Sequence, residues 1–206
     1  MHDPALRTAP SVGRHLTGVD RAVAMAASVA KALQAIGLED EGIDLVLSAH
    51  DLAMGPRVKQ LDDDHHPDYL HPGRSVLILL RDVGLTDAAS LAASALLESE
   101  FESLRIALSR VESEVGAEVA GVLLEIPAPG DERLVERLVL LPVPVRLAAL
   151  SERLDQLRHA HLHQNQGWWA AIHEEATWAW LPVAERTHER IAQRYRHWHR
   201  TFARRL

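Results

Sequence analysis

Apolar side chains recur every three or four residues through most of this 206-residue chain. In residues 145–163, for example, Leu147, Leu150, Leu154 and Leu157 fall on one side of a helix with about 3.6 residues per turn. Alanine, leucine, arginine and glutamate, which are good helix formers, dominate the sequence, whereas glycine is sparse. The pattern and the composition together predict an all-α fold.

The breaks between these segments are short, which predicts one multi-helix domain over residues 19–206. Residues 1–18 lack helical periodicity, and we predict a flexible segment there. The last helix is predicted to be long and to bend at Pro182. The predicted helices are 20–35, 41–59, 72–83, 87–101, 104–125, 131–141, 145–163 and 168–202.

Charge is distributed unevenly along the chain, whose net charge is -7. Residues 186–206 contain seven arginines and one acid and so carry +6, whereas residues 1–185 carry -13. An acidic body of this kind disfavours broad binding to nucleic acids. We interpret the spacing of Arg186, Arg190 and Arg194 as one helical face that meets acidic residues or solvent.

The sequence has no cysteine, which excludes disulfides, thiolate metal ligands and a cysteine nucleophile. No apolar run reaches the roughly 18 residues needed to span a membrane. Residues 1–16 also lack the apolar core of a signal peptide, so we expect a cytoplasmic protein without membrane contacts. No pattern in the sequence predicts an oligomeric state.

The strongest functional signal lies in residues 70–103. His71 opens the first of two predicted helices, and an acidic cluster that includes Glu98 and Glu102 closes the second. A short turn between two antiparallel helices would bring His71 close to Glu98. Histidine nitrogen and carboxylate oxygen both bind divalent metals, so this place is a candidate site for a metal or a polar ligand.

Four ordered segments resemble the motifs of the HD-domain hydrolases of RelA/SpoT-type alarmone enzymes and their small single-domain relatives. Residues 67–72 (Pro-Asp-Tyr-Leu-His-Pro) resemble the segment that holds the first metal histidine of that family. Residues 93–103, 115–120 and 150–158 resemble its next three motifs, and Gly167-Trp168 resembles the start of the closing helix in the small relatives. The resemblance covers roughly residues 45–200. It implies an HD-like, all-α domain.

Members of that family remove the 3′-pyrophosphate of the nucleotide ppGpp with the help of a manganese ion. The resemblance therefore implies metal ligands at His71, Glu98 and Glu152 and a catalytic carboxylate at Glu102. The cofactor it implies is Mn²⁺ or another divalent metal, and a chain that has lost the site would bind none.

The departures from the family's motifs fall on residues that carry the chemistry. Ser99 and Ser103 stand where the family has aspartates. Glu98 replaces the second metal histidine, and Glu152 replaces the last metal aspartate. Because a metal site is sensitive to ligand geometry, these replacements predict weak or absent hydrolysis.

The sequence also predicts contacts to a phosphorylated nucleotide ligand. Arg57 and Lys59 lie near the place where the family has a basic pair that holds the substrate. Arg74 and Gln156, beside the implied metal ligands, complete the predicted ligand-binding set. These positions carry either a positive charge or hydrogen-bond donors, which suit phosphate oxygens.

Two groups of histidines are weaker candidates. His159, His161 and His163 alternate, and a helix does not place residues two apart on one face, so we interpret them as a polar helix end. His50 lies in the middle of a predicted helix on a partly apolar face and could point into the pocket.

Three functional hypotheses remain open at this point. The first is a degenerate HD-like protein that binds a phosphorylated nucleotide or a partner and has little or no catalytic activity. The alternative is an active, metal-dependent phosphohydrolase with a rewired site of His71, Glu98 and Glu152. The third is a helical domain with a purely structural or partner-binding role.

Overall fold

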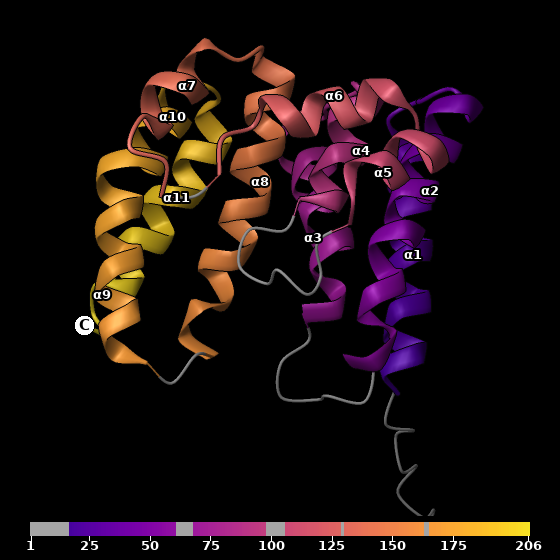
Figure 1. The fold of residues 1–206 in the computed structure, drawn as a ribbon. Helices are drawn as coiled ribbons and strands as arrows, with labels where there is room; N and C mark the ends of the chain where they lie inside the picture. The colour runs from indigo at the N-terminus through magenta and orange to yellow at the C-terminus, as the bar shows by residue number, and fades with distance from the viewer. Residues whose placement is uncertain (1–16, 61–67, 98–105, 129, 163–164) are drawn as a thin grey trace, which may run out of the picture.

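The computed structural model describes residues 17–60, 68–97, 106–128, 130–162 and 165–206. Most of these residues are helical, and none of them lies in a β-strand. The predicted all-α fold is therefore confirmed. No helix within the described ranges is long and apolar enough to cross a membrane. Figure 1 shows α3 and α8 beside each other near the middle of the molecule.

Most helices agree with the predicted ranges to within a few residues. In chain order they are α1 (Gly18–Ala35), α2 (Asp40–Met54), α3 (His71–Ile78), α4 (Ala88–Leu96), α5 (Leu108–Glu114), α6 (Ala117–Glu125), α7 (Leu134–Leu140), α8 (Val143–His159), α9 (Gln166–Glu175), α10 (Leu181–Glu185) and α11 (Glu189–Phe202). Short 3₁₀ turns form η1 (Gly55–Gln60), η2 (Asp68–Leu70) and η5 (Ala160–Leu162). Turns of π-helix form η3 (Leu79–Val83) and η6 (Ala176–Trp180).

Side-chain caps explain where some of these helices begin. Oγ1 of Thr17 accepts a hydrogen bond from the Asp20 amide at 3.1 Å, and the Asp20 carboxylate accepts one from the Thr17 amide at 2.9 Å. At the start of α4, the Asp87 carboxylate accepts a hydrogen bond from the Ser90 amide at 2.8 Å. Each cap satisfies an amide that has no partner within its helix. Helix α1 thus begins two residues before its predicted start, and residues 1–16 of the predicted flexible segment lie outside the described residues.

Helix α4 lies at the centre of the core. All its residues from Ala89 to Leu96 are buried, and α2, α3, α6 and α8 pack around it. Its alanine and serine side chains are small, so the surrounding helices can approach closely. The fully buried Leu91 on α4 and Leu150 and Leu154 on α8 contribute apolar contacts to this core. Burying a leucine side chain stabilises a fold by about 1.5–3 kcal/mol. This packing fixes α3 against α8, the two helices that carry most of the polar site.

The prediction of one helix over residues 104–125 is wrong. Helix α5 ends at Glu114, and α6 begins at Ala117. Between them Gly116 has a φ of +116°. Glycine adopts this conformation without the steric cost that a Cβ atom imposes. The chain turns there, and α5 and α6 pack against each other.

The prediction of one helix from residue 168 to residue 202 is also wrong. Pro182 is the second residue of α10, directly after the π-helical turn η6, and the chain stays helical through it. The helical run ends later, at residues 186–188, where the Thr187 hydroxyl donates to the Val183 carbonyl at 2.7 Å. His188 is extended, with φ −159° and ψ 126°, and α11 begins after it. This break lets α11 pack back against α10 and α8.

Two arginines of α11, Arg194 and Arg196, form ion pairs with acidic side chains. A nitrogen of Arg194 lies 2.6 Å from Oδ1 of Asp82, which ties α11 to η3. Arg196 forms ion pairs with Glu185 at 3.1 Å and Glu189 at 2.6 Å. For Arg194, the predicted contact with an acidic residue is confirmed. The prediction of one helical face for Arg186, Arg190 and Arg194 is wrong, because Arg186 lies at the end of α10, before the break that precedes α11.

Candidate functional site

The main polar cluster joins the start of α3 to the middle of α8. His71 is the first residue of α3, and Glu152 and Asp155 lie on α8. All three side chains are buried. Nε2 of His71 lies 3.7 Å from Oε1 of Glu152, so the structure confirms the predicted proximity of these two residues.

Asp155 is the centre of this cluster. Its Oδ2 atom lies 2.8 Å from Nδ1 of His71, and Nε of Arg74 donates to both of its carboxylate oxygens at 2.9 Å. One turn further along α8, Nδ1 of His159 lies 2.8 Å from the Asp155 backbone carbonyl and 3.7 Å from Oδ1. A fully buried carboxylate therefore has two positively charged or ionisable partners on α3 and a third on α8.

The partners of Asp155 determine its protonation. Burial alone would raise the pKa of Asp155, but the hydrogen bond and charge of His71, with the charge of Arg74, lower it to about 2. Asp155 is therefore ionised at neutral pH and accepts the His71 contact, which assigns a proton to Nδ1 of His71. This contact fixes the orientation of the imidazole ring and directs Nε2 toward Glu152.

The Nε2 atom of His71 is the part of the cluster that fits a metal ion. It is buried and has no hydrogen-bond partner among the described residues. Two N and O ligands at about 2.0–2.2 Å from one ion lie roughly 3–3.7 Å apart, so the 3.7 Å separation from Glu152 fits the upper end of that range. In known metal sites, a histidine ligand usually donates its other ring N–H to a carboxylate, which fixes the orientation of the ring. Asp155 is placed to do this for His71.

The described residues supply only part of a complete metal site. No group of three or more His, Cys, Asp or Glu side chains among them could hold a metal ion. Glu98, the third implied ligand, and Glu102, the implied catalytic residue, both lie outside the described residues. His71 and Glu152 are therefore the two candidate ligands that the structure brings together.

A second polar network joins α8 to α9 and η6. Arg153 donates to Gln156 at 2.8 Å and to Glu175 at 3.1 Å. Its guanidinium lies 5.7 Å from the ring centroid of Trp180, whose Nε1 donates to Glu175 at 2.6 Å. Gln156, a predicted ligand contact, thus accepts a hydrogen bond from a neighbour on its own helix, and Arg153 joins α8 to α9 and η6.

The predicted basic pair lies near the end of α2. Arg57 is buried, with 2% of its surface exposed, and donates to the Ala53 carbonyl at 2.7 Å. Lys59 lies in the same 3₁₀ turn, η1. His50 of α2 is also buried; its Nδ1 lies 3.5 Å from Oδ1 of Asp51, and its Nε2 has no hydrogen-bond partner within the described part of the chain. Burial lowers the pKa of His50.

Arg74 connects the Asp155 cluster to a basic pocket of about 300 Å³. The pocket is formed by α1, α3, η3, α8 and α11, and it contains four arginines and one acid. Its lining residues are Met25, Arg74, Leu77, Ile78, Arg81, Asp82, Arg158 and Arg194. We call this the arginine pocket.

The arginines of this pocket differ in their partners. Arg74 is held by Asp155, and Arg194 is held by Asp82. Arg81 and Arg158 are exposed and form no ion pair with any carboxylate in the part of the chain that the structure describes. Two guanidinium groups of the pocket are therefore available for an anion from solution.

Sequence reasoning identified Arg74 but missed Asp155, His159 and the arginine pocket. A signal for the first two was present, because Asp155 and His159 are four residues apart and share one face of α8. The interpretation of His159 as part of a polar helix end did not foresee its contact with Asp155. The arginine pocket draws on five elements that are far apart in the sequence, so no local pattern could reveal it.

No protein-family model matches the chain, and no curated protein matches it. The assignment of a function therefore depends on the chemistry of the residues described above.

Proposed function

We propose that this protein binds a phosphorylated nucleotide through the arginine pocket and has weak or no hydrolytic activity. The observation that carries the proposal is the convergence of Arg74, Arg81, Arg158 and Arg194 on one cavity with a single acid. Guanidinium groups donate paired hydrogen bonds whose geometry matches phosphate oxygens. The proposal agrees with the ligand class that the resemblance to alarmone hydrolases implies.

The size and lining of the pocket support a ligand of this kind. A volume of about 300 Å³ is at the lower end of the range for small-molecule sites and suits the phosphorylated part of a nucleotide. Met25, Leu77 and Ile78 add apolar surface beside the arginines. A ligand with both a phosphate group and a less polar body fits this combination better than an inorganic ion.

The arrangement around His71 supports binding over hydrolysis. Asp155 is fully buried and is bonded to both His71 and Arg74, so it has no position for a substrate or an attacking water. The family positions that would supply further acids hold Ser99 and Ser103. A protein with these replacements retains a means of binding phosphate but lacks part of the implied catalytic set.

One observation favours a second candidate function, a divalent-metal-dependent phosphohydrolase. Nε2 of His71 is directed at Glu152, and its other ring nitrogen is held by Asp155. With Mn²⁺ or a similar ion, these two residues would act as ligands, and the ion would supply Lewis acidity toward a phosphoryl oxygen. In that case the arginine pocket would hold the substrate.

Calorimetric titration with ppGpp, GDP and inorganic phosphate tests the first function. We expect nucleotide binding that an Arg81→Gln/Arg158→Gln variant weakens at least tenfold, because hydrogen bonds to charged groups contribute about 1.5–3 kcal/mol each. An Arg110→Gln/Arg133→Gln variant is the matched control. It removes the same charge at exposed positions outside the pocket and should bind as the wild type does.

A pyrophosphate-release assay with added Mn²⁺ separates the two functions. The first proposal predicts no more than trace turnover by the wild type. Robust turnover that His71→Ala abolishes would establish the second. Equal nucleotide affinity in the pocket variant and the control variant would overturn the arginine pocket as the binding site.

A further inference from the structure

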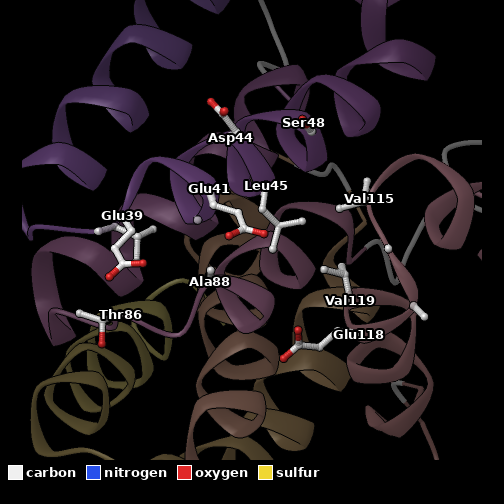
Figure 2. A pocket seen from close by; sticks show the side chains of 14 residues that line it. Glu39, Glu41, Asp44, Leu45, Ser48, Thr86, Ala88, Val115, Glu118 and Val119 are labelled. Carbon is white, nitrogen blue, oxygen red and sulfur yellow. The ribbon is translucent and has the colours of Figure 1, made fainter.

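A groove with both apolar and acidic lining residues lies between the start of α2, the start of α4 and the start of α6. It has a volume of about 670 Å³, and its floor includes Leu45 of α2, Ala88 of α4, and Val115 and Val119 near α6. Figure 2 shows the side chains of Leu45 and Val119 extending into the space between these helices. The groove shares no lining residue with the arginine pocket.

The rim of the groove is acidic. Glu39 and Glu41 lie on the α2 side and Glu118 lies on the α6 side, as Figure 2 shows. A fourth acid, Asp44 of α2, also lines the groove, and all four carboxylates are exposed and form no ion pair within the described ranges. No lysine or arginine lines the groove. The carboxylates therefore face solvent around an apolar floor without a cation of this chain beside them.

This combination specifies the chemistry of an occupant. An apolar floor is complementary to an apolar side chain, and carboxylates on two opposite walls are complementary to cationic groups on either side of it. A metal ion does not fit, because no three acidic or histidine side chains of the described residues form a metal-binding group. Nucleic acid does not fit either, since its phosphates would meet the four carboxylates of the groove.

We propose that this groove docks a basic peptide segment of a partner protein. An apolar side chain of the segment occupies the floor beside Leu45 and Ala88, and lysine or arginine side chains on both sides pair with Glu41 and Glu118. A peptide fits better than a small cation, because the acidic walls belong to different helices with the apolar floor between them. Several linked cationic groups can reach both walls at once.

Fluorescence anisotropy with a labelled synthetic peptide, Gly-Lys-Arg-Leu-Leu-Arg-Lys-Gly, tests this proposal. We expect binding that weakens about tenfold when serines replace the two leucines and about tenfold when glutamines replace the basic residues. Weakening by the glutamine replacements alone, with no effect of the serine replacements, would mean attraction to the acidic body without docking in the groove, and would overturn the proposal. So would failure of the original peptide to bind.

Three protein variants locate the binding. Glu39→Gln/Glu41→Gln/Glu118→Gln should weaken binding about tenfold, because each exposed ion pair contributes modestly and the three effects combine. Glu132→Gln/Glu136→Gln/Glu174→Gln, at exposed positions outside the groove, removes the same charge and should leave the affinity unchanged. Ala117→Trp adds a large side chain at an exposed lining position without changing charge, and it should also weaken binding.

Circular dichroism of each variant checks that it remains folded. Equal weakening by the rim variant and its charge-matched control would overturn the proposal. Sedimentation of the wild-type protein provides the last arm. A dimer that the rim variant abolishes would show that a second copy of this chain occupies the groove, and would overturn its assignment to a partner protein.

Discussion

His71 Nδ1 and Asp155 Oδ2 lie 2.8 Å apart, and this contact joins the first turn of α3 to the buried face of α8. The two residues are 84 positions apart in the sequence. Arg74, one turn along α3, donates to the same carboxylate. The contact between these two helices is therefore polar at its centre, although the surrounding core is apolar.

Removing the carboxylate of Asp155 should destabilise the protein strongly. Asp155→Ala leaves His71 and Arg74 beside a buried site without their acidic partner, and loss of one member of such a cluster costs about 3–5 kcal/mol. We expect a decrease of about 3 kcal/mol in the free energy of unfolding, measured by urea denaturation. Glu114→Ala, which breaks the exposed pair with Arg110, should cost less than about 0.5 kcal/mol. Similar losses in both variants would contradict a central role for Asp155.

The stabilising effect of Asp155 should depend on pH below about 5. Its pKa is about 2 in the folded protein and 3.8 ordinarily. A carboxylate whose pKa is lowered by folding stabilises the protein above its unfolded pKa, and this contribution is lost as the pH falls through the folded pKa. The difference in unfolding free energy between the wild type and Asp155→Asn should therefore shrink by about 2 kcal/mol between pH 6 and pH 2. Urea titrations across this range measure it, and a constant difference would contradict the lowered pKa.

His50 should also make the protein less stable as the pH falls, but at a higher pH than Asp155 does. Burial lowers its pKa in the folded protein, so the unfolded chain takes up a proton first as the pH falls, and stability decreases below about pH 6.5. Replacement by leucine removes this titration. His50→Leu should cost less than about 1.5 kcal/mol at pH 8, because the two side chains have similar volumes. It should gain stability relative to the wild type at pH 5.

Thermal unfolding at both pH values checks this prediction. His161→Gln is the control, since His161 is exposed and its substitution should change stability similarly at pH 8 and pH 5. A His50→Leu variant that loses more stability at pH 5 than at pH 8 would show that His50 is protonated and paired in the folded state.

Helical spacing was sufficient to predict the fold class, because apolar residues three or four positions apart, such as Leu150, Leu154 and Leu157, are buried in the core as predicted. Helix breaks were harder to place. Gly116 lies in a segment whose valines have good helical spacing, and only its positive φ shows that the chain turns there. Pro182 is a strong local signal for a helix break, but it lies within α10 and does not end the helix. The actual break, near Thr187, contains neither glycine nor proline.

The candidate site was predictable only in part, because part of it depends on tertiary packing. The proximity of His71 to Glu152 followed from ordered motifs along the chain, and the structure places the two side chains 3.7 Å apart. The arginine pocket depends on how α11 returns to η3 through the pair of Arg194 and Asp82. Such a return depends on the tertiary packing of α11, which spacing within a single helix does not encode.

The last prediction separates the stability of α11 from the binding of a ligand. The Tyr195 hydroxyl donates to the Leu150 carbonyl at 2.8 Å, and both residues are buried. Tyr195→Phe keeps the ring but removes this hydrogen bond, which should lower the free energy of unfolding by about 1 kcal/mol. It should leave nucleotide affinity unchanged, because Tyr195 does not line the arginine pocket.

Arg194→Ala, one residue earlier on the same helix, should give the reverse result. Its pair with Asp82 is partly exposed, so the loss of stability should be below about 1 kcal/mol. The variant removes one of the four guanidinium groups of the arginine pocket, and nucleotide affinity should fall about tenfold. Urea denaturation and calorimetric titration of both variants test the pair of predictions. Loss of affinity in Tyr195→Phe but not in Arg194→Ala would mean that α11 affects binding through the core and that its arginine does not contact the ligand.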